Sequence, residues 1–133
     1  MSYRGDSRTV EKIIADILDA ASASAEIVSR GKDGRSEDRI LRLAGEAVIN
    51  RIGDAANKLP EDVRAAIPGV PWDDIRANRV LVAHIYHRID YDILRATLAH
   101  DVPRLAAELE RWRDRELGRE AGAERESGPG LGP

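Results

Sequence analysis

Side chains that can donate, accept or exchange a proton are clustered in the segment ANRVLVAHIYHRID, residues 77–90, among them Arg79, His84, Tyr86, His87 and Asp90. An imidazole has an unperturbed pKa near ~6.5, so it can take up or release a proton at physiological pH. An arginine keeps its charge and can bind phosphate oxygens through two parallel hydrogen bonds. The cluster therefore predicts proton-transfer chemistry beside an anionic group.

The spacing of these residues predicts that they lie on one helix, opposite its apolar face. At about 100° per residue, the apolar side chains of the segment and its extension fall on one broad face that should enter the core. They are Leu81, Val82, Ile85, Ile89 and Ile93. Arg79 and His84 diverge by about 140° and are about 7.5 Å apart along the axis, so one helix does not aim both at one atom. Two copies related by a twofold axis could bring them together, which predicts a homodimer with a composite site. An ordinary solvated polar face remains the alternative interpretation of this short pattern.

The elements that must position this helix follow from apolar periodicity. Stripes at i, i+3, i+4 and i+7 predict helices over residues 10–28 and 40–55, and Pro60 begins a short helix. The motif helix should run from about Ile75 to His100, and Asp101 followed by Pro103 should start the last helix. Fold class is thus predicted to be all-α, an antiparallel bundle of four main helices plus a short helix.

Composition predicts one folded domain and excludes several classes of protein. The chain has 133 residues, no cysteine and a net charge of −3, so a thiolate metal site and a generally basic, nucleic-acid-coating surface are excluded. We expect a flexible N-terminus over residues 1–8, a helical domain over residues 9–117 and a disordered tail over residues 118–133. No membrane span, signal peptide, metal-ligand set or cofactor motif is evident, so we expect a cytoplasmic protein without a metal or cofactor.

Four sequence elements resemble the HepT toxins of the HEPN superfamily. The first, RVLVAHIY at residues 79–86, resembles their Arg-x4-His-x-Tyr motif. The others are GEAVIN at residues 45–50, PGVPWDDI at 68–75 and RID at 88–90, and the similarity runs in order from about Arg8 to Trp112. One position departs from the family, which has Asn or Asp directly after the motif arginine. Here that position is Val80, and Asn78 stands before the arginine.

The resemblance implies the toxin of a type VII-like toxin–antitoxin system, a metal-independent endoribonuclease acting on tRNA or mRNA. Arg79 and His84 would be catalytic. The partner would be an MntA-like nucleotidyltransferase antitoxin that silences the toxin by transferring AMP to Tyr86 (AMPylation).

The residue chemistry agrees with that implication. A base near the ribose 2′-hydroxyl and a cation near the phosphate would give a 2′,3′-cyclic phosphate end. Supporting roles are predicted for Asn78, His87, Asp90 and, through close packing of its helix against the motif helix, Glu46. Because of Val80, a non-catalytic HEPN dimer that binds RNA or the nucleotidyltransferase is kept as the alternative.

Overall fold

The computed structural model describes residues 7–31, 39–75 and 91–127, which form helices joined by turns, without any strand. The elements are α1 (Ser7–Gly31), α2 (Arg39–Lys58), α3 (Glu61–Ala65), α5 (Tyr91–Ala96), the π-helical turn η2 (Thr97–Asp101) and α6 (Val102–Ser127). Residues 72–75 form a further helical turn. The predicted all-α fold class is confirmed. None of these helices combines the length and the apolarity needed to span a membrane.

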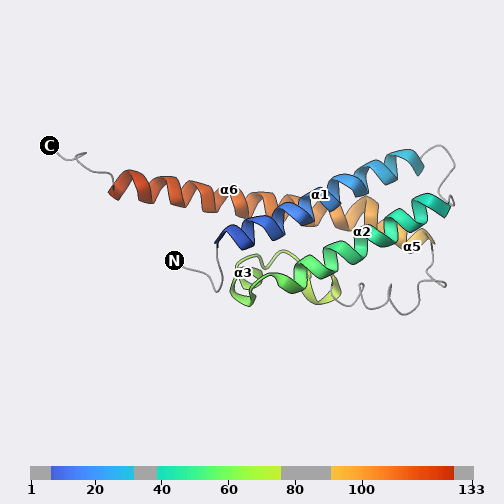
Figure 1. The fold of residues 1–133 in the computed structure, drawn as a ribbon, viewed down its shortest axis with the longest axis horizontal. Coiled ribbons are helices and arrows are strands. Elements are labelled where there is room, and N and C mark those ends of the chain that lie inside the picture. Colours follow the sequence, from blue (N-terminus) through green and yellow to red (C-terminus); the bar gives the residue numbers. More distant parts are fainter. Residues whose placement is uncertain (1–6, 32–38, 76–90, 128–133) are drawn as a thin grey trace.

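The long helices of the described residues lie side by side, with α1 packed against both α2 and α6 (Figure 1). Helix α1 runs in the opposite direction to the other two (Figure 1). The first half of its predicted apolar stripe is buried, because Val10, Ile13, Ile14 and Ile17 all belong to the core, whereas Ala25 in the second half is exposed. Periodicity therefore identified the face of α1 that packs into the bundle.

A compact connection after α2 closes one end of the core. Helix α3 begins after Pro60, whose carbonyl accepts hydrogen bonds from the Val63 and Arg64 N–H groups at 3.1 Å. The indole N–H of Trp72 lies 3.1 Å from the carbonyls of both Arg64 and Ile67, and its ring packs against the core. This tryptophan thus holds the turn against the bundle.

The last predicted helix begins at Val102 as expected, but no loop precedes it. The Val102 N–H donates to the carbonyl of Thr97, five residues earlier, which makes the junction a π-helical turn. In a continuing helix the Leu98 carbonyl would accept a hydrogen bond from the N–H of residue 102 or 103. Val102 donates to Thr97 instead and Pro103 has no N–H, so the Leu98 carbonyl receives neither bond. That carbonyl instead accepts a hydrogen bond from the fully buried Ser24 hydroxyl of α1, at 2.9 Å. The predicted start of the last helix is therefore confirmed, and a side chain on a neighbouring helix satisfies the carbonyl at the π-helical turn that precedes it.

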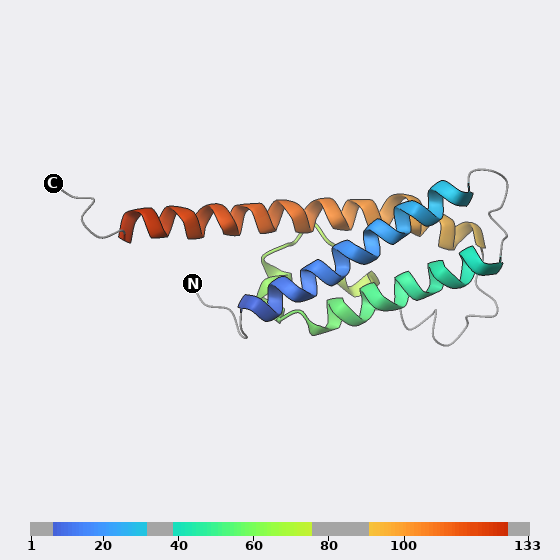
Figure 2. The same ribbon diagram turned by 45° about the horizontal axis from the view of Figure 1, so that its top comes forward.

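Both boundaries of the predicted domain fall inside helices. Helix α1 starts at Ser7, before residue 9, and α6 continues to Ser127, past residue 117. Figure 2 shows the end of α6 projecting beyond the bundle. Residues 118–127 are thus helical where we expected a disordered tail; alanines and the ion pair between Arg119 and Glu116, at 3.2 Å, favour helix there.

Three apolar residues that the stripes assigned to the core are exposed. The exposed fractions are 70% for Ile40, 44% for Leu43 and 66% for Ile93. Helix α2 buries a face that contains Gly45, Ile49 and Ile52, and the first two exposed side chains lie outside it. The position of an apolar residue on the helical wheel shows that its side chain favours burial. It does not show that another part of the chain packs over that side chain.

Candidate functional site

Six of the seven candidate site residues lie outside the described residues. They are Asn78, Arg79, His84, Tyr86, His87 and Asp90, all within residues 76–90. Their roles and mutual placement stay predictions. The structure does describe the seventh candidate, Glu46, and the chain on both sides of this segment. We call these flanking parts, residues 72–75 before it and α5 with η2 after it, the frame.

The frame on the N-terminal side is a helical turn held by Trp72. The Ile75 N–H donates to the Pro71 carbonyl at 3.1 Å, which closes the turn that leads into the motif segment. The Trp72 N–H donates to the Val70 carbonyl at 2.9 Å. Side-chain and backbone bonds of Trp72 therefore fix the direction in which the chain enters residue 76.

The frame on the C-terminal side is a close crossing of α2 with α5 and η2. A Cβ atom added to Gly45 would lie 2.9 Å from Leu98 Cδ1 and 3.4 Å from Leu94 Cδ2. Glycine allows this close approach without a shift of the Leu98 side chain, and the approach helps to set the position of the helix that follows Asp90. Close packing against the predicted motif helix is thus present at the Gly-Glu-Ala element.

Glu46, the next residue on α2, is the candidate that the structure places. It is 8% exposed, and no other described residue forms a hydrogen bond or an ion pair with it. Buried carboxylates require hydrogen bonds or a countercharge. Glu46 lies between Gly45, which contacts α5 and η2, and Ile49, which shares a cleft with Ile75. It therefore sits on α2 between the two ends of the frame.

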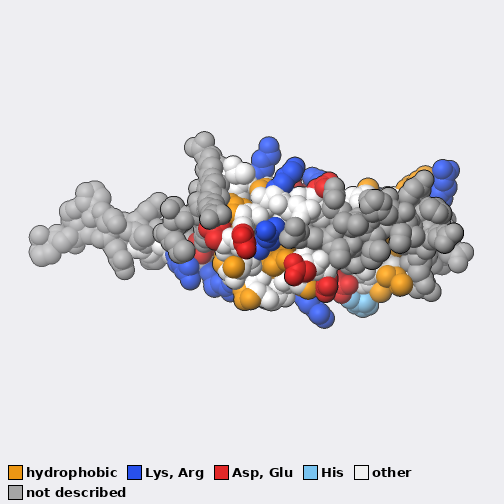
Figure 3. Space-filling view, turned by 90° about the horizontal axis from the view of Figure 1, so that it is seen from below, with side chains coloured by type: hydrophobic (Ala, Val, Ile, Leu, Met, Phe, Trp, Pro, Cys, Tyr) orange, Lys and Arg blue, Asp and Glu red, His pale blue; other side chains and the backbone are white. Residues whose placement is uncertain are grey.

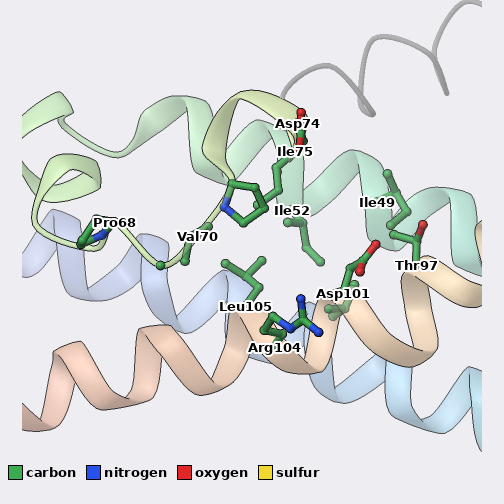
Figure 4. Close-up of a pocket in the computed structure, with 13 residues that line it drawn as sticks. Ile49, Ile52, Pro68, Val70, Asp74, Ile75, Thr97, Asp101, Arg104 and Leu105 are labelled. Atoms are coloured by element: carbon green, nitrogen blue, oxygen red, sulfur yellow. The ribbon is translucent and has the colours of Figure 1, made fainter.

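That cleft, of about 620 Å³, lies between α2, residues 68–75 and the junction of η2 with α6 (Figure 4). Its lining is mixed, and Figure 4 shows the apolar side chains of Ile52, Val70 and Leu105 around it. Asp101 and Arg104 line it from the α6 side.

Asp74 completes the charged lining, so the cleft carries two carboxylates and one guanidinium. This cleft was not predicted from the sequence. The signal available was the spacing of Thr97, Asp101 and Arg104 at i, i+4 and i+7, which places polar residues on one helix face.

Charges on the described surface are mixed. On the face shown in Figure 3, acidic and basic side chains are interspersed, and hydrophobic side chains lie beside the pale blue histidine. Within the described ranges, no group of three or more His, Cys, Asp or Glu side chains could hold a metal ion.

Comparison with known proteins gives a consistent result. Residues 17–112 match the model of the family described as HepT-like, ribonuclease HepT-like. A protein of Methanocaldococcus jannaschii named "Putative RNase MJ1380" is 29% identical over 107 residues, which are 77% of this chain and 95% of the relative. A protein of Thermococcus cleftensis named "Probable ribonuclease HepT" is 28% identical over 76 residues, 57% of this chain and 69% of the relative. No solved structure matches the chain.

Proposed function

Because the chain belongs to the ribonuclease HepT-like family, we propose that it is a metal-independent endoribonuclease that cuts tRNA or mRNA. One observation carries this proposal. The family match over residues 17–112 includes the whole Arg-x4-His-x-Tyr sequence at residues 79–86, in its expected place between the Pro-Trp element and α5.

The proposed reaction is in-line attack of a ribose 2′-oxygen on the neighbouring phosphorus. His84 takes the 2′-hydroxyl proton as the P–O2′ bond forms. The P–O5′ bond breaks, and the 5′-oxygen takes a proton from water and leaves as a 5′-hydroxyl. Arg79 binds the phosphate oxygens and stabilises the charge that develops in the transition state. The other product is a 2′,3′-cyclic phosphate.

The proposed active unit is a homodimer in the cytoplasm. Arg79 and His84 diverge on a single helix, so we place Arg79 of one protomer beside the His84 of the other. Asn78, His87 and Asp90 would line or orient this shared site. The burial of Glu46 supports a positioning role for its carboxylate, since such a group requires a donor or a cation.

The proposed regulation is AMP transfer to Tyr86 by a nucleotidyltransferase antitoxin. A phosphate and a nucleoside on this side chain would repel RNA phosphate and block access to Arg79. Incubation with the antitoxin and ATP should add one AMP to the wild type and to Tyr91→Phe, but not to Tyr86→Phe, as judged by mass spectrometry. AMP on another residue would exclude this form of regulation.

Cleavage in EDTA tests the nuclease proposal. Wild-type protein incubated with total tRNA should give 2′,3′-cyclic phosphate ends, and His84→Ala should lower the rate by about 10²–10⁴-fold, the usual contribution of a general base. His100→Ala is the matched control, because His100 is exposed on η2 and lies outside the motif. Equal losses in both variants, or cleavage that needs a divalent metal, would overturn the proposed mechanism.

Val80 favours a second candidate, a dimer that binds RNA or the nucleotidyltransferase but does not cut. It replaces the Asn or Asp expected after the motif arginine, so one polar group is missing beside Arg79. Wild-type protein that binds tRNA without producing new ends would select this candidate. Val80→Asn should then restore cleavage if the missing polar group is the cause.

A further inference from the structure

Three arginines at one end of the bundle have no counterion among the described residues. Arg39 and Arg42 of α2 and Arg95 of α5 are exposed, and none of them forms an ion pair or a hydrogen bond there. Other exposed arginines do: Arg30 pairs with Glu26 at 2.6 Å, and Arg51 pairs with an aspartate of α1. The end of the bundle thus carries positive charge that no described acidic side chain neutralises.

The three arginines come from elements that meet. Helix α2 contacts α5, and Arg95 and Leu41 line the same small cavity beside the end of α1. Figure 1 shows the start of α2 and α5 at the same end of the molecule. Arg39 and Arg42 stand close to Leu41 on α2, so all three arginines lie at the end of the bundle where α2 meets α5.

Apolar side chains accompany the arginines. Ile40, Leu43 and Ile93 are exposed at this same end, whereas Leu117 is the other large exposed hydrophobic residue of the described chain. Guanidinium groups suit phosphates, and aliphatic side chains can pack against bases and riboses that are not stacked in a duplex. The combination fits a single-stranded nucleic acid better than a simple anion.

We propose that Arg39, Arg42 and Arg95, with Ile40, Leu43 and Ile93, form a surface that binds the single-stranded part of the RNA substrate. This proposal rests on the proposed ribonuclease function. Helix α5 begins at Tyr91, directly after the motif segment, so Arg95 lies only five residues beyond Asp90. RNA held there would be bound next to the chain that carries the cleavage motif. The cleft of Figure 4 is a weaker candidate, because two carboxylates line it and would repel phosphate.

Salt dependence of RNA binding tests this surface. The probe is a single-stranded RNA bound to His84→Ala protein, in which cleavage should be suppressed. We compare that protein with one that also carries Arg39→Gln, Arg42→Gln and Arg95→Gln. Each phosphate contact contributes about 0.7 to the slope of log affinity against log salt for single strands, so three lost contacts should reduce the slope by about 2.

The matched control carries Arg113→Gln, Arg115→Gln and Arg119→Gln on α6. It loses the same three charges on the same background, so it should bind RNA with the parent slope. Ile93→Ser should weaken binding without changing the slope, since an apolar contact releases no counterions. Equal slopes for both triple variants would show that binding follows net charge and would overturn the proposal.

Two further measurements distinguish RNA binding at this surface from contact between protomers and from cleavage itself. If the Arg39/Arg42/Arg95 variant sediments as a smaller species than the parent, the surface is an interface between protomers and the RNA proposal is wrong. In the background that retains His84, slower cleavage by this triple variant at low RNA concentration, with an unchanged rate at saturating RNA, supports the surface. Wild type that binds RNA through this surface but makes no cuts would contradict the proposed nuclease and leave the surface in place.

Discussion

The two ends of the bundle differ in how their apolar side chains are used. At the end closed by α3, Val63, Ile67 and Leu109 are almost completely buried, and Trp72 fixes the connection with two indole hydrogen bonds. At the opposite end, Ile40 and Ile93 are equally apolar but mostly exposed. The first end shows what the chain needs in order to fold. The second shows apolar and cationic groups that folding alone does not require.

The largest difference between the ends should appear in stability. Leu109→Ala removes a fully buried side chain and should lower the free energy of unfolding by about 2–5 kcal/mol. Ile93→Ala removes one that is 66% exposed and should change it by less than about 0.5 kcal/mol. Urea denaturation followed by circular dichroism measures both. A large loss from Ile93→Ala would show that this end is covered in solution and would remove the contrast.

A medium effect is expected at the junction between the two ends. Ser24→Ala leaves the Leu98 carbonyl buried without a donor and should cost about 1–3 kcal/mol. Ser22→Ala on the exposed side of α1 is the control and should stay within about 0.5 kcal/mol of wild type. Pro103→Ala supplies a new N–H near the same carbonyl, so the cost of Ser24→Ala should be smaller on that background. Additive effects in this double-mutant cycle would contradict the pairing of Ser24 with the π-helical turn.

The smallest effects concern two glycines. Gly45→Ala places a methyl group 2.9 Å from the flexible end of Leu98, so overpacking should exceed the gain in helix propensity by about 1 kcal/mol. Gly118→Ala has nothing within 4 Å of its new Cβ and should increase the helicity of the α6 extension. Thermal unfolding distinguishes the two. Stabilisation by Gly45→Ala would mean that α2 and the π-helical turn are less closely packed than the structure shows.

Sequence patterns predicted the elements of the fold better than their connections. The stripe of α1, the short helix after Pro60 and the start of the last helix near Val102 all follow from local signals, because caps and periodicity act within a few residues. The π-helical turn does not, since its stability depends on Ser24, 74 residues before Leu98 in the sequence. A hydrogen-bond donor so far away in the sequence produces no signal in the local sequence pattern.

Of the candidate site residues the structure places only Glu46, and the other six stay predictions. Glu46 was identified from the small residues beside it, and its burial agrees with a crossing of helices at Gly45. The exposure of Ile40 and Ile93 could not be predicted, because an amphipathic pattern does not reveal whether the same chain covers the apolar face. The charged lining of the cleft was missed for the related reason that it combines residues from three separate elements.

The positions of the two tryptophans provide intrinsic optical reporters for both regions. Trp112 belongs to the buried core, whereas Trp72 lies three residues before Ile75, at the entrance to the motif segment. The chain contains no other tryptophan and no phenylalanine, so its fluorescence comes mainly from these two indoles. With Trp112 replaced by Phe, emission from Trp72 should respond when RNA or an antitoxin reaches the neighbouring segment. With Trp72 replaced instead, the remaining emission should follow global unfolding alone, without any attached dye.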